Sequence, residues 1–439
     1  MITTSPLMLA PLLLALCLPA HAQTPPRSSA IEWLQQAIAS DPALATQRAT
    51  LDAARAAEDA ASAGLGPELT LSGQRGRSRR TSADRLPWVP EAHSLPAAGH
   101  TLTLSQLLYD GQRTQATVNA AQARVQQEQE RLRRRLNERL LAMREALHNE
   151  EAAAARLHHA RDALRDMQSL NTLVQQKHDA GLVALADVRR AQSRLLDAQR
   201  GVTEAQARWQ EARLTLAGET GLPVPTFAPD HEPFVALDSA ELDALGLACA
   251  QACPEVREAS LQVDRAQAEL RAAEAAWHPR LSLELSNGES HNLSGNAEQY
   301  RSASAFLKLN WTFYDGGLRT AQTRRLGHEM QAQEQTLEET RRTVQTRWSV
   351  GRSRLQASVE LYGIALRNAS VARQARELAE QGLRAGLRSP IEVADTVNEE
   401  TRALDDAATR DAERRLGQDR LLALTGLLAR HLGLAEAEP

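Results

Sequence analysis

The chain has 439 residues, of which 42% are hydrophobic, 24% charged and 3% aromatic, and its formal net charge is -4. The low aromatic content and the abundance of Ala, Leu, Arg, Gln and Glu favour long helices over large globular cores. Because basic and acidic residues are interspersed, we expect no basic surface of the kind that binds nucleic acid.

Residues 1–22 have the pattern of a secretory signal peptide. An apolar run from Leu7 to Leu18 precedes Ala20-His21-Ala22, which has the small-x-small form of a cleavage site. Leu16 stands before Cys17 where a lipidation motif requires Gly or Ala, so we expect secretion without a lipid anchor. After this segment no apolar run is long enough to be a transmembrane helix.

The remaining sequence is a tandem duplication. Tyr109-Asp110-Gly111 recurs as Tyr314-Asp315-Gly316 at an offset of 205 residues, and upstream Gly66-Pro67 matches His278-Pro279 at an offset of 212. Insertions gather in exposed loops, so the change of offset predicts a loop between these two landmarks in each copy. A non-helical, proline-rich linker near Pro223 to Pro233 joins the copies.

These landmarks divide the chain into a signal peptide (1–22) and two structural repeats (23–230 and 231–439). In the first repeat we expect a helix over 42–63, a hairpin over 67–109, a long helix over 114–178, a tip turn over 179–186 and a helix over 187–217. In the second we expect a helix over 254–277, a hairpin over 279–314, a long helix over 318–383, a tip turn over 384–389, a helix over 390–424 and a C-terminal tail.

The long helices are predicted from hydrophobic spacing. Between Thr114 and His178 apolar residues recur mostly at spacings of seven, four and three, which is typical of a coiled coil. No Gly or Pro interrupts these 65 residues, so at ~1.5 Å per residue the helix would be about 97 Å long. The apolar positions are Val118, Val125, Leu132, Leu136, Leu140, Met143, Leu147, Leu157, Leu164, Leu170 and Val174.

The hairpins are predicted where the hydrophobic period becomes two. Apolar and polar residues alternate over 281–286 and again over 305–313, and the first repeat has the same pattern on either side of an Arg- and Pro-containing loop at 75–98. Strands of about ten residues with one apolar face fit a bilayer-spanning barrel. A soluble hairpin packed on the helices is the alternative.

In the barrel interpretation, Leu307, Leu309 and Trp311 face lipid, with Leu309 near the midplane, and Lys308 and Asn310 face the lumen. Four strands cannot close a barrel, and open sheet edges cannot face lipid. Three chains that contribute four strands each would close a twelve-stranded barrel, and their helices would close a tube beneath it.

No catalytic or metal-binding pattern is present in the sequence, so we expect neither an enzyme nor a cofactor. We expect His148, His158 and His159 to face water from a charged helix. Cys249 and Cys253 are spaced for a disulfide across a helix boundary at Pro254, but we expect buried free thiols.

The order helix, hairpin, long helix, turn and helix, given twice, resembles the TolC family of bacterial outer-membrane efflux and secretion proteins. Residues Ala180–Val188 and Ala385–Val393 are similar to the turns of that family, and Pro67, Pro279, Gly111, Gly316 and Gly317 mark its strand–helix junctions. The resemblance implies a homotrimer with a twelve-stranded β-barrel in the outer membrane and an α-helical tunnel across the periplasm. It also implies docking to a periplasmic adaptor (membrane fusion) protein and to an inner-membrane efflux pump or type I secretion ATPase.

The tips, with Gly181 and Gly386 at the two turns, contain the candidate functional residues. Ser389-Pro390-Ile391-Glu392 has the form of a capping box, so we expect the Glu392 side chain to cap the backbone. The resemblance places Glu392 and Asp395 at the constriction of the periplasmic entrance, where threefold symmetry would turn a carboxylate into a ring.

The resemblance also places a latch between Asp187 and Arg388 on neighbouring tips. Ala186 and Leu383 depart from the best-known pattern of the family, which carries a hydroxyl and a Tyr there. A periplasmic coiled-coil scaffold or adaptor without a pore is the alternative function. The exported substrate, whether drug, metal or protein, is selected by the inner-membrane partner and is not encoded in these motifs.

Overall fold

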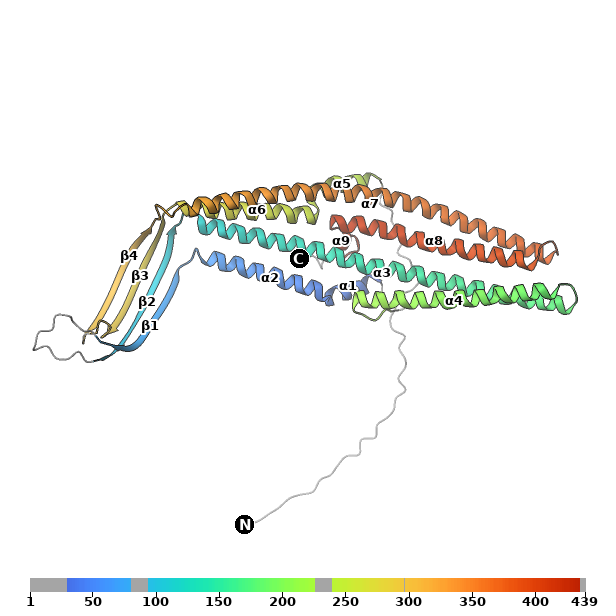
Figure 1. The fold of residues 1–439 in the computed structure, drawn as a ribbon, viewed down its shortest axis with the longest axis horizontal. Helices are drawn as coiled ribbons and strands as arrows, with labels where there is room; N and C mark the ends of the chain where they lie inside the picture. The colour runs from blue at the N-terminus through green and yellow to red at the C-terminus, as the bar shows by residue number, and fades with distance from the viewer. Residues whose placement is uncertain (1–29, 80–93, 226–238, 296, 435–439) are drawn as a thin grey trace, which may run out of the picture.

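The computed structural model describes residues 30–79, 94–225, 239–295 and 297–434, which form one elongated molecule. Figure 1 shows a β-sheet at one end of the molecule, a long bundle of helices next to it, and at the far end two turns that each connect a long helix to a shorter one. The expected signal peptide, residues 1–22, lies outside the described residues.

Two helices of 67 residues, α3 (Arg113–Asp179) and α7 (Leu318–Arg384), run along the bundle. Each is about 100 Å long at ~1.5 Å per residue, and each begins and ends within one residue of the range expected from the sequence. The shorter helices α2 (Pro42–Ala63) and α4 (Leu185–Thr220) pack along α3, and α6 (Pro254–Glu274) and α8 (Pro390–Thr425) pack along α7. Because α6 and α8 also contact α3, they connect the two copies (Figure 1).

The apolar positions that predicted α3 form its buried stripe. Each of them is buried except Leu164, which is half-buried. The spacing therefore predicted the contact face of this helix as well as its length.

The four strands form one antiparallel sheet in the order β1-β2-β3-β4. The strands are β1 (Glu68–Ser78), β2 (Leu95–Tyr109), β3 (Arg280–His291) and β4 (Gln299–Asn310). The expected loop at 75–98 is shorter than predicted, because β1 continues to Ser78 and β2 begins at Leu95. The strand expected to run through Trp311 and Phe313 ends earlier, at Asn310, and Trp311 instead donates a hydrogen bond to the Trp277 carbonyl at 3.1 Å.

The strand register gathers leucines from all four strands on one face of the sheet. Directly paired residues of antiparallel strands share a face, and the pairs Leu69↔Leu104, Leu104↔Leu285, Leu283↔Leu307 and Leu281↔Leu309 all do so. The opposite face carries pairs such as Thr103↔Ser286 and Ser282↔Lys308.

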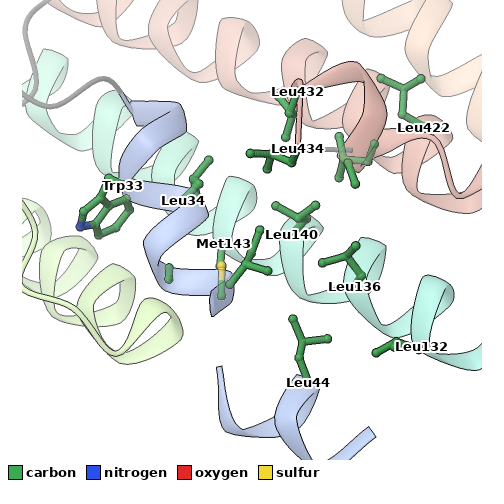
Figure 2. Packing of buried hydrophobic residues seen from close by; sticks show 14 of the residues in the cluster. Trp33, Leu34, Leu44, Leu132, Leu136, Leu140, Met143, Leu422, Leu432 and Leu434 are labelled. Carbon is green, nitrogen blue, oxygen red and sulfur yellow. The ribbon is translucent and has the colours of Figure 1, made fainter. Parts of the chain in front are cut away.

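The largest core lies in the middle of the bundle. Figure 2 shows Leu34 from α1 (Ala30–Ser40), Leu136, Leu140 and Met143 from α3, and Leu422 from α8 converging on it. The sequence analysis missed three short helices in this region, α1, α5 (Ser239–Ala252) and α9 (Leu428–His431). Helix α1 packs on α3 and α4, α5 packs on α6, α7 and α8, and α9 packs on α3 and α8 (Figure 1).

The expectation of free thiols at Cys249 and Cys253 is wrong. The two residues form a disulfide across the corner between α5 and α6, with Cα atoms 4.6 Å apart. The helix boundary at Pro254 makes this possible, because α5 ends at Ala252 and the chain is extended at Cys253 before α6 begins. Both cysteines are buried beside Trp348 and Leu421.

Candidate functional site at the helical tips

The two tip turns have the same backbone geometry. Gly181 and Gly386 both have φ of 75°, a left-handed conformation that glycine adopts without a steric penalty. In each turn the next residue donates its N–H back to the helix, Leu182 to Lys177 O and Leu387 to Gly382 O, both at 2.8 Å. The duplicated Ala-Gly-Leu motif thus closes the two helical hairpins, α3–α4 and α7–α8, in the same way, and it leaves Leu182 and Leu387 exposed.

The helices that leave the two turns are capped differently. Ser389 accepts a hydrogen bond from the Glu392 N–H at 3.3 Å, with Pro390 at the first helical position, whereas Ala184 before α4 offers no side-chain cap. The prediction that the Glu392 side chain caps the backbone is wrong, because its carboxylate accepts from Arg388 Nη1 at 3.4 Å. The Arg388 guanidinium, one turn before Glu392, binds the Glu392 carboxylate. The Ser389 hydroxyl is therefore the side-chain cap of the helix.

The two residues of the expected latch have partners within their own hairpins in a single chain. Asp187 Oδ1 lies 3.8 Å from Arg190 Nη1, and Arg388 Nη1 lies 3.4 Å from Glu392 Oε2. The Arg388 side chain folds back over Gly382, where an added Cβ would lie 2.6 Å from its Cγ. A link from Asp187 to Arg388 of a neighbouring chain therefore stays a prediction.

Asp395 is held by a residue that the sequence analysis did not single out. Arg194 Nη2 on α4 donates to Asp395 Oδ1 on α8 at 2.9 Å, which joins the first copy to the second. A charge asymmetry in the sequence signals this pairing. The first turns of α4 are rich in Arg, and those of α8 are rich in Asp and Glu.

An apolar seam lies beside this ion pair. Met167 and Leu170 of α3 pack on Leu383 of α7 and on Val393 and Val397 of α8. Next to the seam, Arg376 of α7 binds Asp166 of α3 at 3.0 Å and Glu400 of α8 at 2.9 Å. The two hairpins are therefore held together near their tips by a buried apolar contact with ionic contacts beside it.

The strand–helix junctions are also duplicated. Gly111 and Gly316 both have φ of 68°. Asp110 accepts from the Thr114 N–H at 2.9 Å, and Asp315 accepts from the Arg319 N–H at 3.1 Å. Each aspartate thus satisfies the first turn of a long helix, where a negative charge is favourable.

Three of the other junction residues also lie where the strands meet the helices. Pro67 and Pro279 directly precede β1 and β3, and Gly317, with φ of 90°, directly precedes α7. Gly111 has a further constraint, since a Cβ there would lie 2.5 Å from the Cβ of His278.

A buried polar network joins the copies in the middle of the bundle, and it corrects the expectation that His148 faces water. His148 Nε2 lies 3.1 Å from Asp419 Oδ2, and Arg144 Nε donates to the same oxygen at 3.0 Å. His148 Nδ1 lies 3.3 Å from Glu151 Oε2. His159 is also half-buried, 2.9 Å from Asp405, and only His158 of the three is exposed.

The network shifts the pKa values of its members. Burial favours the neutral imidazole, but hydrogen bonds to Asp419 and Glu151 outweigh it and raise the pKa of His148 above its usual value. Burial opposes ionisation of Asp419 as well, yet the His148 hydrogen bond and the Arg144 charge lower the pKa of this carboxyl. A protonated His148 and an ionised Asp419 therefore stabilise each other between α3 and α8.

Within the described part of the chain, no cluster of three or more His, Cys, Asp or Glu side chains has the arrangement of a metal site. None of the described helices contains a stretch long and apolar enough to cross a membrane. The geometry points to the sheet, the long bundle and the tips as the functional parts.

A leucine-faced sheet with two open edges, continued by a bundle about 100 Å long, defines a class of protein: a membrane-inserted sheet on a long helical stem. The model of the outer membrane efflux protein family matches residues 33–222 and 248–427, and the chain belongs to this family. It is an outer-membrane efflux channel protein, a transport protein and not an enzyme.

Solved structures share the fold at low sequence identity. A membrane protein from Pseudomonas aeruginosa is 18% identical with a TM-score of 0.76, and the match covers 90% of each chain. The MtrE outer membrane channel of Neisseria gonorrhoeae is 18% identical with a TM-score of 0.74, covering 91% of this chain and 89% of that chain. VceC of Vibrio cholerae is 16% identical with a TM-score of 0.72, covering 92% and 95%. No curated protein matches the sequence.

Proposed function

We propose that three copies of this chain form a channel that exports substrates as the outer component of a tripartite efflux pump or a type I secretion system. The observation that carries the proposal is the sheet: β1 and β4 form its open edges, and leucines from all four strands lie on one face. Lipid cannot satisfy the backbone groups of an open edge, so the edges must pair with those of other chains.

The helices support the same assembly. Four of the exposed apolar residues on α7 are separated by multiples of seven, which is the spacing of a coiled-coil seam. Their exposure is large for residues of this size, and a neighbouring chain would cover them. They are Val350 44%, Ile364 48%, Val371 62% and Leu378 67%.

In the trimer the tips form the periplasmic entrance. Asp395 and Glu392 on the first turns of α8 are the residues proposed for its constriction, and Asp187 and Arg388 of neighbouring chains are those proposed for its latch. Three carboxylates in a narrow opening attract cations and exclude anions. The β-hairpin that lies between helices in each of the two copies supports the channel over the alternative of a pore-free scaffold.

The partners proposed are a periplasmic adaptor and an inner-membrane efflux pump or secretion ATPase. The exposed tip residues Leu182 and Leu387 are the positions to test, by placing a photocrosslinker at each in cells. The expected product is an adduct with a coiled-coil adaptor, and a crosslinker at Leu309 on the sheet is the matched control that should give none. Identical adducts at Leu309 and at the tips would contradict tip docking.

A further inference from the structure

The acidic residues near the start of α8 differ in where their counter-ions come from. Glu392 pairs with Arg388, and Glu400 pairs with Arg373 and Arg376, all within the α7–α8 hairpin. Asp395 pairs instead with Arg194 of the α3–α4 hairpin. Among the described ion pairs of these three acids, that of Asp395 is therefore the one that spans both hairpins.

The position of this pair makes it sensitive to movement between the hairpins. Asp395 follows Ala394 of the apolar seam, and Arg194 precedes Leu195, which packs on the same seam. Within each helical hairpin the helices contact each other extensively, α3 with α4 and α7 with α8. Between the hairpins α3 also packs on α8, whereas the contact of α4 with α8 is small. Separation of the tips would thus part Arg194 from Asp395 and leave the Arg388–Glu392 pair intact.

The pair is suited to reversible release. The side chains of Arg194 and Asp395 are 41% and 50% exposed, so solvent screens their attraction and can replace it. The two charges nevertheless lie at 2.9 Å while the pair is formed, and the guanidinium then offsets the carboxylate charge.

We propose that Arg194 is the counter-ion of Asp395 and sets the ion selectivity of the entrance. While the hairpins are together Arg194 neutralises the Asp395 ring, and when they separate the ring becomes anionic and prefers cations. Cation preference is thereby coupled to opening. This inference rests on the proposed position of Asp395 at the entrance.

The test uses the purified full-length trimer in planar bilayers. Reversal potentials in a KCl gradient give the cation preference, and hexaamminecobalt(III) added on the tip side gives the affinity for a trivalent cation. Replacing Arg194 with Ala should raise the K⁺ to Cl⁻ permeability ratio and tighten the block by about two- to fivefold, the change expected for loss of one exposed ion pair. Arg194→Lys should keep wild-type selectivity.

The controls separate this inference from the proposal on which it rests. Arg189 is exposed on the same helix and donates to Gln192, so Arg189→Ala removes the same charge without touching Asp395 and should change selectivity little. Asp395→Ala should lower the cation preference, and adding Arg194→Ala to it should have no further effect.

Three results would contradict either the position of Asp395 at the entrance or the role of Arg194 as its counter-ion. Unchanged selectivity in both Asp395→Ala and Arg194→Ala would remove Asp395 from the entrance and overturn the proposed function of that site. A change of selectivity in Asp395→Ala without one in Arg194→Ala would overturn only the proposal that Arg194 is the counter-ion of Asp395. Higher conductance in Arg194→Ala with unchanged selectivity would show that Arg194 only holds the two helical hairpins together. That result would also overturn the counter-ion proposal.

Discussion

His148 of the first copy and Asp419 of the second meet in the buried middle of the bundle, with Nε2 3.1 Å from Oδ2. Both side chains are almost inaccessible, at 2% and 5% exposure. Arg144 donates to the same carboxylate oxygen, so one aspartate of α8 holds two residues of α3. The duplicated halves are thus joined by a buried polar contact in the middle of the bundle.

This contact predicts a pH dependence of stability. The pKa of His148 is raised in the folded chain, so its contribution is complete below the ordinary value of about 6.5 and is lost as the pH rises through the folded pKa. The pKa values of Asp419 and Glu151 are lowered, so their contribution is present above about pH 4.5 and is lost as the pH falls through their folded values. Apparent melting temperatures should therefore decline as the pH rises above about 6.5.

Replacing His148 with Gln removes the titrating group and keeps a hydrogen-bonding side chain of similar reach. The decline above about pH 6.5 should flatten in this variant. His158→Gln is the matched control, because His158 is exposed on the same helix and should leave the profile unchanged. An unaltered profile in His148→Gln would show that another group sets the pH dependence.

Removal of Asp419 should be severely destabilising. Asp419→Ala removes the buried carboxylate that Arg144 and His148 share, a loss of about 3 to 5 kcal/mol in the free energy of unfolding. Asp406 is 48% exposed and pairs with Arg410 on the same helix, so Asp406→Ala should cost about 0 to 1 kcal/mol. Denaturant unfolding followed by helical circular dichroism compares the two, and equal costs would contradict the buried network.

The face of the sheet is tested by paired substitutions. Leu285 lies near the middle of β3 and pairs with Leu104, so it replaces Leu309, which is one residue from the end of β4, as the midplane position. Leu285→Arg should impair barrel assembly by about 2 to 4 kcal/mol, and Leu309→Arg, closer to the interface, by less.

The control for this prediction is Ser286→Arg, which places the same charge on the opposite face, where Ser286 pairs with Ser304. Trimer yield from outer membranes is the measurement. Equal yields from Leu285→Arg and Ser286→Arg would show that the leucine face does not meet lipid.

We expect the disulfide at the corner between α5 and α6 to contribute to the free energy of unfolding. Cys249→Ala with Cys253→Ala should lower stability by about 2 kcal/mol, the loop-entropy value for so short a closed loop. The wild-type protein should lose the same amount in reductant, and the double variant should not respond. Free thiols detected by alkylation of the unreduced, unfolded protein would contradict the bond.

The long helices and the duplication were predictable from sequence because local patterns encode them. A 67-residue helix repeats its apolar spacing many times, and the duplicated tip and strand-exit motifs each place a left-handed glycine at the same position in both copies, at Gly181 and Gly386 and at Gly111 and Gly316. The short helices α1, α5 and α9 carry no such repetition and are stabilised by the core they cover. The end of β4 at Asn310 was also missed, because apolar alternation continues through Phe313 after the strand pairing stops.

The residues of the candidate site were predictable one by one, but their partners were not. Asp395 and Glu392 follow a recognisable turn, whereas Arg194 meets Asp395 only because α4 and α8 lie together at the tips. His148 was misplaced for the same reason. Its neighbours on α3 are charged, and the carboxylate that makes its burial favourable comes from α8, 271 residues away.

The mass of the detergent-solubilised particle, corrected for bound detergent, tests the central claim most directly. The described residues of each chain form four strands with open edges at β1 and β4, so a stable particle must contain several chains. We predict a particle of three chains, each with the 48.0 kDa mass of the sequence less any cleaved signal peptide. A monodisperse particle of one chain that retains its β-sheet signal would contradict the channel architecture.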